Sequence, residues 1–167
     1  TRPYKRVSMH GVREELLDAQ AEAAGLPLHK AYIPAPCTNE QYQVIMSQLM
    51  QKAKEEGVER VIFGDLFLED IRKYREDHLA KVGMEPVFPL WGRETGELAR
   101  EIIGAGVKAV ITCLDPGKVP RELAGRFYDE ALMEALPEGV DPCAERGEFH
   151  TFCFAGPMFS HPVDIEV

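Results

Sequence analysis

The stretch Val61–Arg93, VIFGDLFLEDIRKYREDHLAKVGMEPVFPLWGR, decides the fold of this chain. Two short apolar runs, at 61–63 and 87–88, enclose a segment with helical periodicity that starts near Leu68. A short, fully apolar run is typical of a strand that helices cover on both faces of a parallel sheet. The stretch therefore predicts a strand, a helix and a second strand.

One charge in the predicted helix is out of place. Four apolar side chains fall on one narrow stripe at about 100° per residue: Leu68, Ile71, Leu79 and Val82. Arg75 falls in the middle of that stripe. Because an unpaired buried charge costs several kcal/mol, we expect Arg75 to reach an acid, a backbone carbonyl or an anionic ligand. Arg75 is therefore a candidate site residue.

Composition and charge narrow the class of protein. With 167 residues, 45% of them hydrophobic and 28% charged, the chain is long enough to bury a sizeable globular core. The net charge of −9 disfavours nucleic acid as a partner, because phosphate backbones are bound by clustered lysine and arginine. No apolar run approaches the ~18 residues that span a bilayer, and no signal-peptide pattern occurs. We expect a cytoplasmic protein without a membrane partner.

Helical and extended patterns alternate along the chain. Helical patterns lie at 12–24, from Thr38 to Gly57, at 96–103 and at 132–136, and Pro120 suits the first position of a helix. Thr38 and Gln41 have the spacing of a capping box. Extended patterns lie at 28–33, at 107–112 as the last parallel strand, and at 148–152 in an alternating tail. This order predicts an α/β domain with a mainly parallel sheet.

Parallel sheets place ligands outside the carboxyl ends of their strands. Four pieces of sequence follow extended patterns, so we expect them to converge on one edge: His10-Gly11, Gly64-Asp65, Trp91–Arg93 and Cys113–Asp115. An acid such as Asp65 is as often a turn or cap residue as a magnesium ligand. Trp91 and Arg93 suit a stacking platform and an anion clamp, or else packed surface and a local ion pair.

The tail carries the acid/base candidates Glu145, Glu148 and His150, although a lone histidine is more often a hydrogen-bonded structural residue. The four cysteines form no C-x-x-C pair, which favours buried free thiols. The alternative is a zinc site from Cys143, His150, Cys153 and His161. The sequence contains no G-x-S-x-G, Walker or G-x-G-x-x-G motif.

Several long motifs occur in one order over nearly the whole chain: Gly64–Arg75, Pro89–Arg93, Gly139–Cys143 and Gly147–Thr151. With them the chain resembles the diphthine–ammonia ligase family of PP-loop ATP pyrophosphatases, also called N-type ATPases or adenine nucleotide alpha hydrolase-like proteins. The resemblance implies a three-layer parallel-sheet HUP/PP-loop domain of Rossmann-like type. Residues 1–115 would form this nucleotide-binding-type domain, and residues 116–167 a small β-containing extension with the GEFHT motif, packed with it as one unit.

The resemblance also implies the reaction of an ATP-dependent amide-forming ligase. ATP with Mg²⁺ adenylates a substrate carboxylate, pyrophosphate leaves, and ammonia attacks the acyl-adenylate. The implied acceptor is diphthine on elongation factor 2, a cobalamin precursor or another small molecule. By motif, Gly64, Asp65, Trp91 and Arg93 would bind the nucleotide, Tyr74, Arg75 and Thr151 the acceptor, and Glu145, Glu148 and His150 would be catalytic.

The chain departs from the family pattern at its start. The phosphate loop of this family, Ser-Gly-Gly-Lys-Asp-Ser, does not occur in the sequence, which begins at Thr1. We therefore expect these residues to be the downstream part of a catalytic domain. The alternative is a non-catalytic α/β domain that binds a small molecule or a protein.

Overall fold

The computed structural model describes residues 5–167 of the chain. Internal contacts divide these residues into two compact units. Unit 1 contains residues 5–29 and 94–167, and unit 2 contains residues 30–93. The predicted domains 1–115 and 116–167 stay a prediction, because contacts within one structure do not show which segments fold alone.

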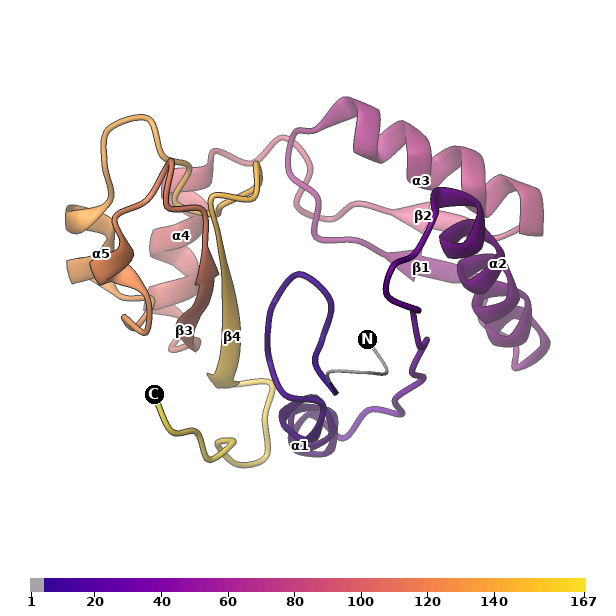
Figure 1. Ribbon diagram of the computed structural model, residues 1–167, viewed down its shortest axis with the longest axis horizontal. Helices are drawn as coiled ribbons and strands as arrows, with labels where there is room; N and C mark the ends of the chain where they lie inside the picture. The colour runs from indigo at the N-terminus through magenta and orange to yellow at the C-terminus, as the bar shows by residue number, and fades with distance from the viewer. Residues whose placement is uncertain (1–4) are drawn as a thin grey trace. The chain divides into compact units, whose positions relative to one another are not determined.

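Unit 2 is a two-stranded parallel sheet with two helices (Figure 1). Its elements are α2 (Asn39–Glu55), β1 (Arg60–Ile62), α3 (Glu69–Val82) and β2 (Glu85–Val87). The strands pair in parallel with Val61 opposite Pro86, α3 packs against β2, and α2 packs against α3. The predicted strand, helix and strand in the central stretch are confirmed, but each strand begins earlier than the predicted runs at 61–63 and 87–88 and ends one residue earlier.

The burial predicted for unit 2 is wrong in two places. Ile62 is 72% exposed, so β1 is not covered on both faces. Successive strand residues point to opposite faces, and only the face of Val61 is half-buried. On α3, Leu79 is buried as predicted but Ile71 is exposed. The predicted strand at 28–33 is also absent, since these residues adopt no regular secondary structure.

The start of α2 shows the predicted capping box. The Thr38 hydroxyl accepts a hydrogen bond from the Gln41 backbone N–H at 3.3 Å, and the Gln41 side chain accepts one from the Thr38 N–H at 3.0 Å. These bonds satisfy two backbone donors that the helix itself leaves unpaired. No residue of α2 is fully buried, so local interactions carry an unusual share of its stability.

Unit 1 is built around two antiparallel strands. Its elements are α1 (Glu14–Ala24), α4 (Thr95–Gly104), β3 (Lys108–Leu114), the 3₁₀ turn η1 (Arg121–Leu123), α5 (Glu130–Ala135) and β4 (Phe149–Ala155). Val110 on β3 lies opposite Phe152 on β4. The alternating strand in the tail is confirmed, but the parallel pairing predicted for 107–112 is wrong because the tail returns beside it. Pro120 precedes only the 3₁₀ turn.

Unit 1 has its core on both faces of this strand pair. One cluster of buried residues consists of Val12, Ala23, Val110, Phe152 and Val163. The other consists of Ile111, Val119, Leu123, Leu132 and Phe149. Neighbouring residues of β3 and β4 fall into different clusters, as the two-residue period of a strand requires.

The described strands form two separate two-stranded sheets. The prediction that four strand ends meet at one edge of a single sheet is therefore wrong for residues 5–167. The fold is mixed α/β with a short parallel sheet. No helix in this part of the chain is long and apolar enough to cross a membrane.

The capping box predicts a measurable loss when it is removed. Thr38→Ala should lower the free energy of unfolding of unit 2 by about 1 kcal/mol, because one backbone N–H loses its partner. Ser47→Ala, an exposed change inside the same helix, is the matched control and should not lower stability, since alanine is the better helix former. Urea unfolding followed by the fluorescence of Trp91, the single tryptophan, measures both. Equal losses for the two variants would contradict the capping argument.

Candidate functional site

In unit 2, two segments meet just beyond the carboxyl ends of the parallel strands. Asp65 follows β1, and Trp91 follows β2. The backbone N–H of Gly92 donates to the carbonyl of Leu66 at 2.8 Å and ties the two segments together. Two of the four sequence pieces expected to converge, Gly64-Asp65 and Trp91–Arg93, are therefore brought together.

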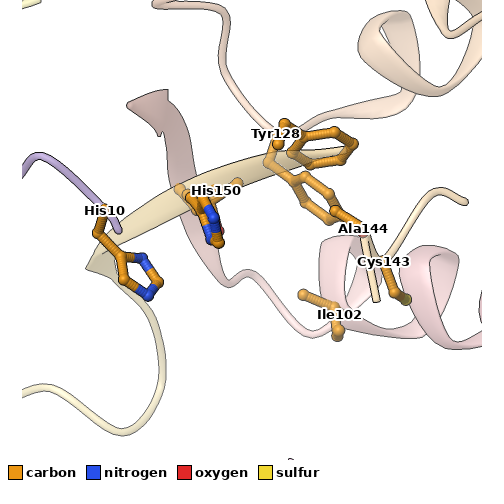
Figure 2. Close-up of a pocket in the computed structure, with 9 residues that line it drawn as sticks. His10, Ile102, Tyr128, Cys143, Ala144 and His150 are labelled. Atoms are coloured by element: carbon orange, nitrogen blue, oxygen red, sulfur yellow. The ribbon is translucent and has the colours of Figure 1, made fainter. Parts of the chain in front are cut away.

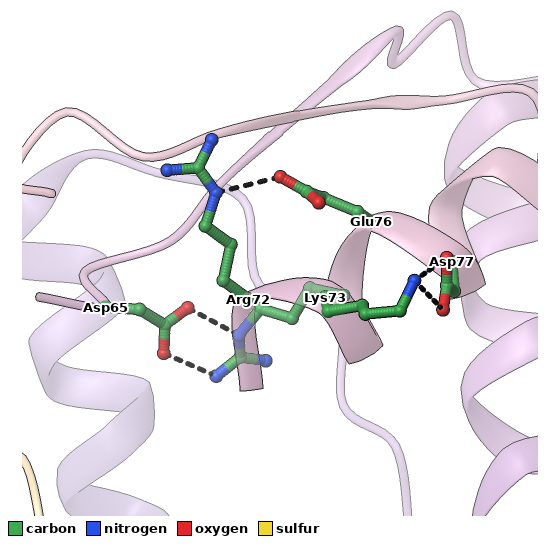
Figure 3. A network of polar contacts seen from close by, with 6 residues as sticks. Asp65, Arg72, Lys73, Glu76 and Asp77 are labelled. Carbon is green, nitrogen blue, oxygen red and sulfur yellow. Dashed lines mark hydrogen bonds and ion pairs between the residues drawn. The ribbon is translucent and has the colours of Figure 1, made fainter. Parts of the chain in front are cut away.

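Arg75 forms a two-point ion pair with Asp65. Its Nε lies 2.5 Å from Asp65 Oδ2, and its Nη2 lies 3.0 Å from Oδ1. Figure 3 shows the Asp65 carboxylate making both contacts beside α3. The Asp65 side chain is 12% exposed and that of Arg75 34%. The prediction that Arg75 reaches an acid is confirmed, and the guanidinium also lies 4.4 Å from the centroid of the Phe63 ring.

Arg72 is a candidate that the sequence reasoning missed. Its guanidinium lies 4.7 Å from the centroid of the Trp91 ring and 4.9 Å from that of Phe88, within cation–π range. Its Nε donates to Glu76 at 2.8 Å (Figure 3). The sequence shows Arg72 and Glu76 only as one more i,i+4 pair of a solvated face, and the aromatic neighbours come from the following strand and loop.

The other predicted residues of unit 2 lie at its surface. Gly64 and Arg93 are exposed. Tyr74 is 39% exposed, and its ring centroid lies 3.9 Å from that of His78. A side chain at Gly64 would meet no atom within 4 Å, so the backbone after β1 is open to a ligand.

Unit 1 contains a pocket of about 260 Å³, here named the histidine pocket. It is lined by His10, Ile102, Ala109, Tyr128, Cys143, Ala144, Phe149, His150 and Thr151. The ring centroids of His10 and His150 are 4.6 Å apart, and their planes are tilted by 52°. Figure 2 shows these rings near one another, away from Cys143 and Ile102. Two predicted residues, His150 and Thr151, are thus brought together with His10.

A buried acid fixes the loop that forms one wall of the histidine pocket. The Asp141 carboxylate accepts hydrogen bonds from the backbone N–H groups of Cys143 at 3.0 Å and Glu145 at 2.8 Å. The Tyr128 hydroxyl donates to the carbonyl of Pro142 at 2.8 Å. Ala144 then takes a φ of 55°, in the left-handed region that a side chain rarely adopts. The turn is therefore held in one strained shape.

The environment of the histidine pocket sets the protonation of its side chains. Burial, and secondly the charge of His10, lowers the pKa of His150 below its ordinary value. Burial and the nearby Asp141 raise the pKa of the Cys143 thiol to about 11. Burial is also the main cause of the raised pKa of Tyr128. At neutral pH the thiol and the phenol keep their protons and His150 is uncharged.

The two predicted acids of the tail do not line the histidine pocket. Glu148 is 3% exposed, and its Oε2 has no hydrogen-bond partner among the described residues. Glu145 is held through its backbone by Asp141. Their predicted catalytic roles stay predictions.

The zinc site that the sequence left as an alternative has no counterpart in the described residues. Residues 5–167 contain no group of three or more His, Cys, Asp or Glu arranged to hold a metal ion, so the alternative zinc site is not formed. All four cysteines are free thiols as predicted, but none is buried: Cys113 is exposed, and Cys37, Cys143 and Cys153 are half-buried.

Comparison with known proteins identifies the family. The sequence matches the family models described as Diphthamide synthase N-terminal domain, over residues 4–86, and Diphthamide synthase C-terminal domain, over residues 94–167. An α/β chain with these two consecutive matches belongs to the class of diphthamide synthases. The chain is therefore a member of the diphthine–ammonia ligase family, as its motifs predicted.

Curated relatives of the chain carry the same family name. The chain is 26% identical to the diphthine–ammonia ligase of Rattus norvegicus, and the alignment covers 98% of this chain and 65% of that protein. It is 25% identical to the Homo sapiens protein with the same coverage, and 28% identical to that of Danio rerio over 93% of this chain and 67% of the relative. The chain thus spans about two thirds of the length of these relatives.

Loss of the partly buried Asp65–Arg75 ion pair should lower stability more than loss of the exposed Arg60–Glu85 pair. Arg75→Met should lower the free energy of unfolding by roughly 1–3 kcal/mol, because it leaves a partly buried carboxylate without its partner. Arg75→Lys should not restore it, since a lysine cannot make both bonds. Arg60→Met, which removes an exposed ion pair with Glu85, is the control and should cost less than about 1 kcal/mol.

Urea unfolding of the single variants and of the Asp65→Asn, Arg75→Met double variant gives the coupling energy between the two side chains. A coupling near zero would show that the pair does not hold the loop after β1 against α3.

Proposed function

We propose that this protein acts in an ATP-dependent, amide-forming ligase reaction. ATP adenylates the carboxylate of an acceptor, pyrophosphate leaves, and ammonia displaces AMP to give an amide. The observation that carries the proposal is the fixed group of Asp65, Arg75, Arg72 and Trp91 beyond the ends of two parallel strands, in a chain of the diphthine–ammonia ligase family. For the fold, we propose a three-layer PP-loop arrangement. We also propose that the protein is cytoplasmic.

The nucleotide would bind at this end of the sheet in unit 2. The Trp91 ring offers a flat apolar face, and the Arg72 guanidinium lies against it while its Nε donates to Glu76. The exposed backbone at Gly64 leaves room for a ligand to approach. We assign Gly64, Asp65, Trp91 and Arg93 to nucleotide binding as the motifs suggest, and add Arg72 to them. Stacking and a nearby cation suit an adenine ring and a phosphate.

Mg²⁺ fits this site only as an ion that arrives with the nucleotide. Both oxygens of Asp65 accept hydrogen bonds from Arg75, and the described residues offer no cluster of three ligands. Mg²⁺ is commonly held by phosphate oxygens, water and one or two carboxylates, so such an ion needs no protein cage. When bound it would share the negative charge of the phosphates.

The motifs suggest Tyr74 and Arg75 of unit 2, and Thr151 of unit 1, as residues that bind the acceptor. Nε and Nη2 of Arg75 both donate to Asp65, so the ion pair fixes the position of the guanidinium. His150, beside Thr151, is uncharged at neutral pH and can accept a proton, while Glu145 and Glu148 remain the other acid/base candidates. Diphthine is the acceptor that the names of the relatives suggest, and a cobalamin precursor or another small molecule is the alternative.

A non-catalytic binding domain is the competing function. Such a domain would keep the α/β scaffold and bind a small molecule or a protein. ATP binding separates the two functions, because only the ligase requires it.

Calorimetry on the full-length protein, with and without Mg²⁺, tests the nucleotide site. Trp91→Ala should weaken ATP binding by about 5- to 100-fold, the loss expected for one base–aromatic stack. Phe127→Ala, which removes a half-exposed ring in unit 1, is the matched control and should bind ATP as the unchanged protein does. No ATP binding by the unchanged protein would contradict the ligase and favour the binding domain.

A further inference from the structure

Among the described residues, two imidazoles and no carboxylate or amine line the histidine pocket. Four titratable side chains line it: His10, Tyr128, Cys143 and His150. The Tyr128 hydroxyl donates a hydrogen bond to the Pro142 carbonyl at 2.8 Å, and the Cys143 thiol donates one to the Thr95 carbonyl at 3.3 Å. Burial raises the pKa of both groups, so neither ionises. Proton acceptance in the lining is left to His10 and His150.

The two imidazoles come from segments that lie far apart in the sequence. His10 belongs to the loop before α1, and His150 to β4, yet their ring centroids are only 4.6 Å apart. Figure 2 shows them adjacent to each other in the pocket. Two rings at this distance disfavour double protonation, because like charges repel. This repulsion favours the state in which at least one ring is neutral and has a nitrogen lone pair that can accept a hydrogen bond.

The rest of the lining selects what these nitrogens can bind. No lysine, arginine, aspartate or glutamate lines the histidine pocket, and much of its wall is apolar, from Ile102, Ala109 and Phe149. An anionic ligand would find no fixed cation there. A small cation that donates N–H groups suits two neutral imidazoles, because each can accept one of its hydrogen bonds.

We propose that His10 and His150 together bind ammonium at the histidine pocket and take its proton, supplying ammonia for amide formation. The inference rests on the proposed ligase function and assigns to His10 a role that the sequence motifs do not give it. Partial burial favours the step, since removal from water disfavours the charged ammonium relative to neutral ammonia.

The step balances without any further reactant beyond the acyl-adenylate. One N–H bond of ammonium breaks, the proton passes to a ring nitrogen of His150, and the electron pair stays on the nitrogen as ammonia. This pair forms the C–N bond with the acyl carbon, and the bond from that carbon to the AMP oxygen breaks with its electrons leaving on AMP. The second proton lost from the new amide nitrogen goes to His10 or to water.

The protonation of the pair gives the site a pH dependence. Burial, and secondly His10, lowers the pKa of His150, so at neutral pH its acceptor nitrogen is available. The groups that face it in the pocket, Tyr128 and Cys143, stay uncharged over this range. As the pH falls through the pKa of His150 and its ring becomes protonated, that acceptor is lost and ammonium is repelled. Ammonium binding should therefore be present above the pKa of His150 and lost below it.

Histidine NMR of the full-length protein tests the site without requiring turnover. Ammonium chloride is titrated at about pH 7.5, with sodium chloride at equal ionic strength as the comparison. We expect a saturable shift of the His10 and His150 ring signals with ammonium alone. His10→Gln and His150→Gln should each weaken ammonium binding by about tenfold or more. His161→Gln, an exposed histidine of unit 1 outside the pocket, is the control and should bind as the unchanged protein does.

The same titrations separate this inference from the ligase proposal. A pH titration should show the His150 midpoint below that of a free histidine, and His10→Gln should raise it. Shifts that are equal for sodium, or unchanged by His10→Gln in a variant with an intact circular dichroism spectrum, would overturn the ammonium site even if ATP binds. If His10→Gln does not fold, the comparison of ammonium with sodium on the unchanged protein decides. Loss of ATP binding would overturn the ligase instead.

Discussion

The two-point ion pair between Asp65 and Arg75 is the interaction on which the site of unit 2 depends. It explains how an arginine can lie on the apolar stripe of α3, since both oxygens of a largely buried carboxylate meet its planar fork. The pair fixes the loop after β1 against the helix. One turn earlier on α3, Arg72 then lies against Trp91 from the segment after β2, so one constraint orders groups from both strands.

The histidine pocket of unit 1 depends on a similar device. Buried Asp141 holds the turn that carries Cys143 and Ala144, as Asp65 holds Arg75. In both units a carboxylate therefore accepts hydrogen bonds that hold a neighbouring segment in position. The left-handed Ala144 indicates that the shape of this turn is maintained against a local cost.

Features that depend on neighbouring residues, such as helix caps, could be predicted from the sequence. Contacts between segments far apart in the sequence could not. The capping box of Thr38 and Gln41 spans only four residues, and the place of Arg75 on the apolar stripe predicted that it needs a partner. Nothing in the helical pattern specified that the partner is Asp65, because this depends on the path of the loop after β1. Alternation in the tail is typical of an antiparallel strand, but it does not specify the partner, so the return of β4 beside β3 could not be predicted. The meeting of His10 with His150 likewise requires the folded unit.

Isotope transfer from the acceptor would test the proposed chemistry at its central bond. Elongation factor 2, the acceptor that the proposal favours, would carry ¹⁸O at both oxygens of its diphthine carboxylate. It would be incubated with the full-length protein, ATP, Mg²⁺ and ammonium, and the products analysed by mass spectrometry. Adenylation predicts that one ¹⁸O atom passes to AMP for each amide formed. Label found in inorganic phosphate together with ADP, or amide formed without label in AMP, would contradict it.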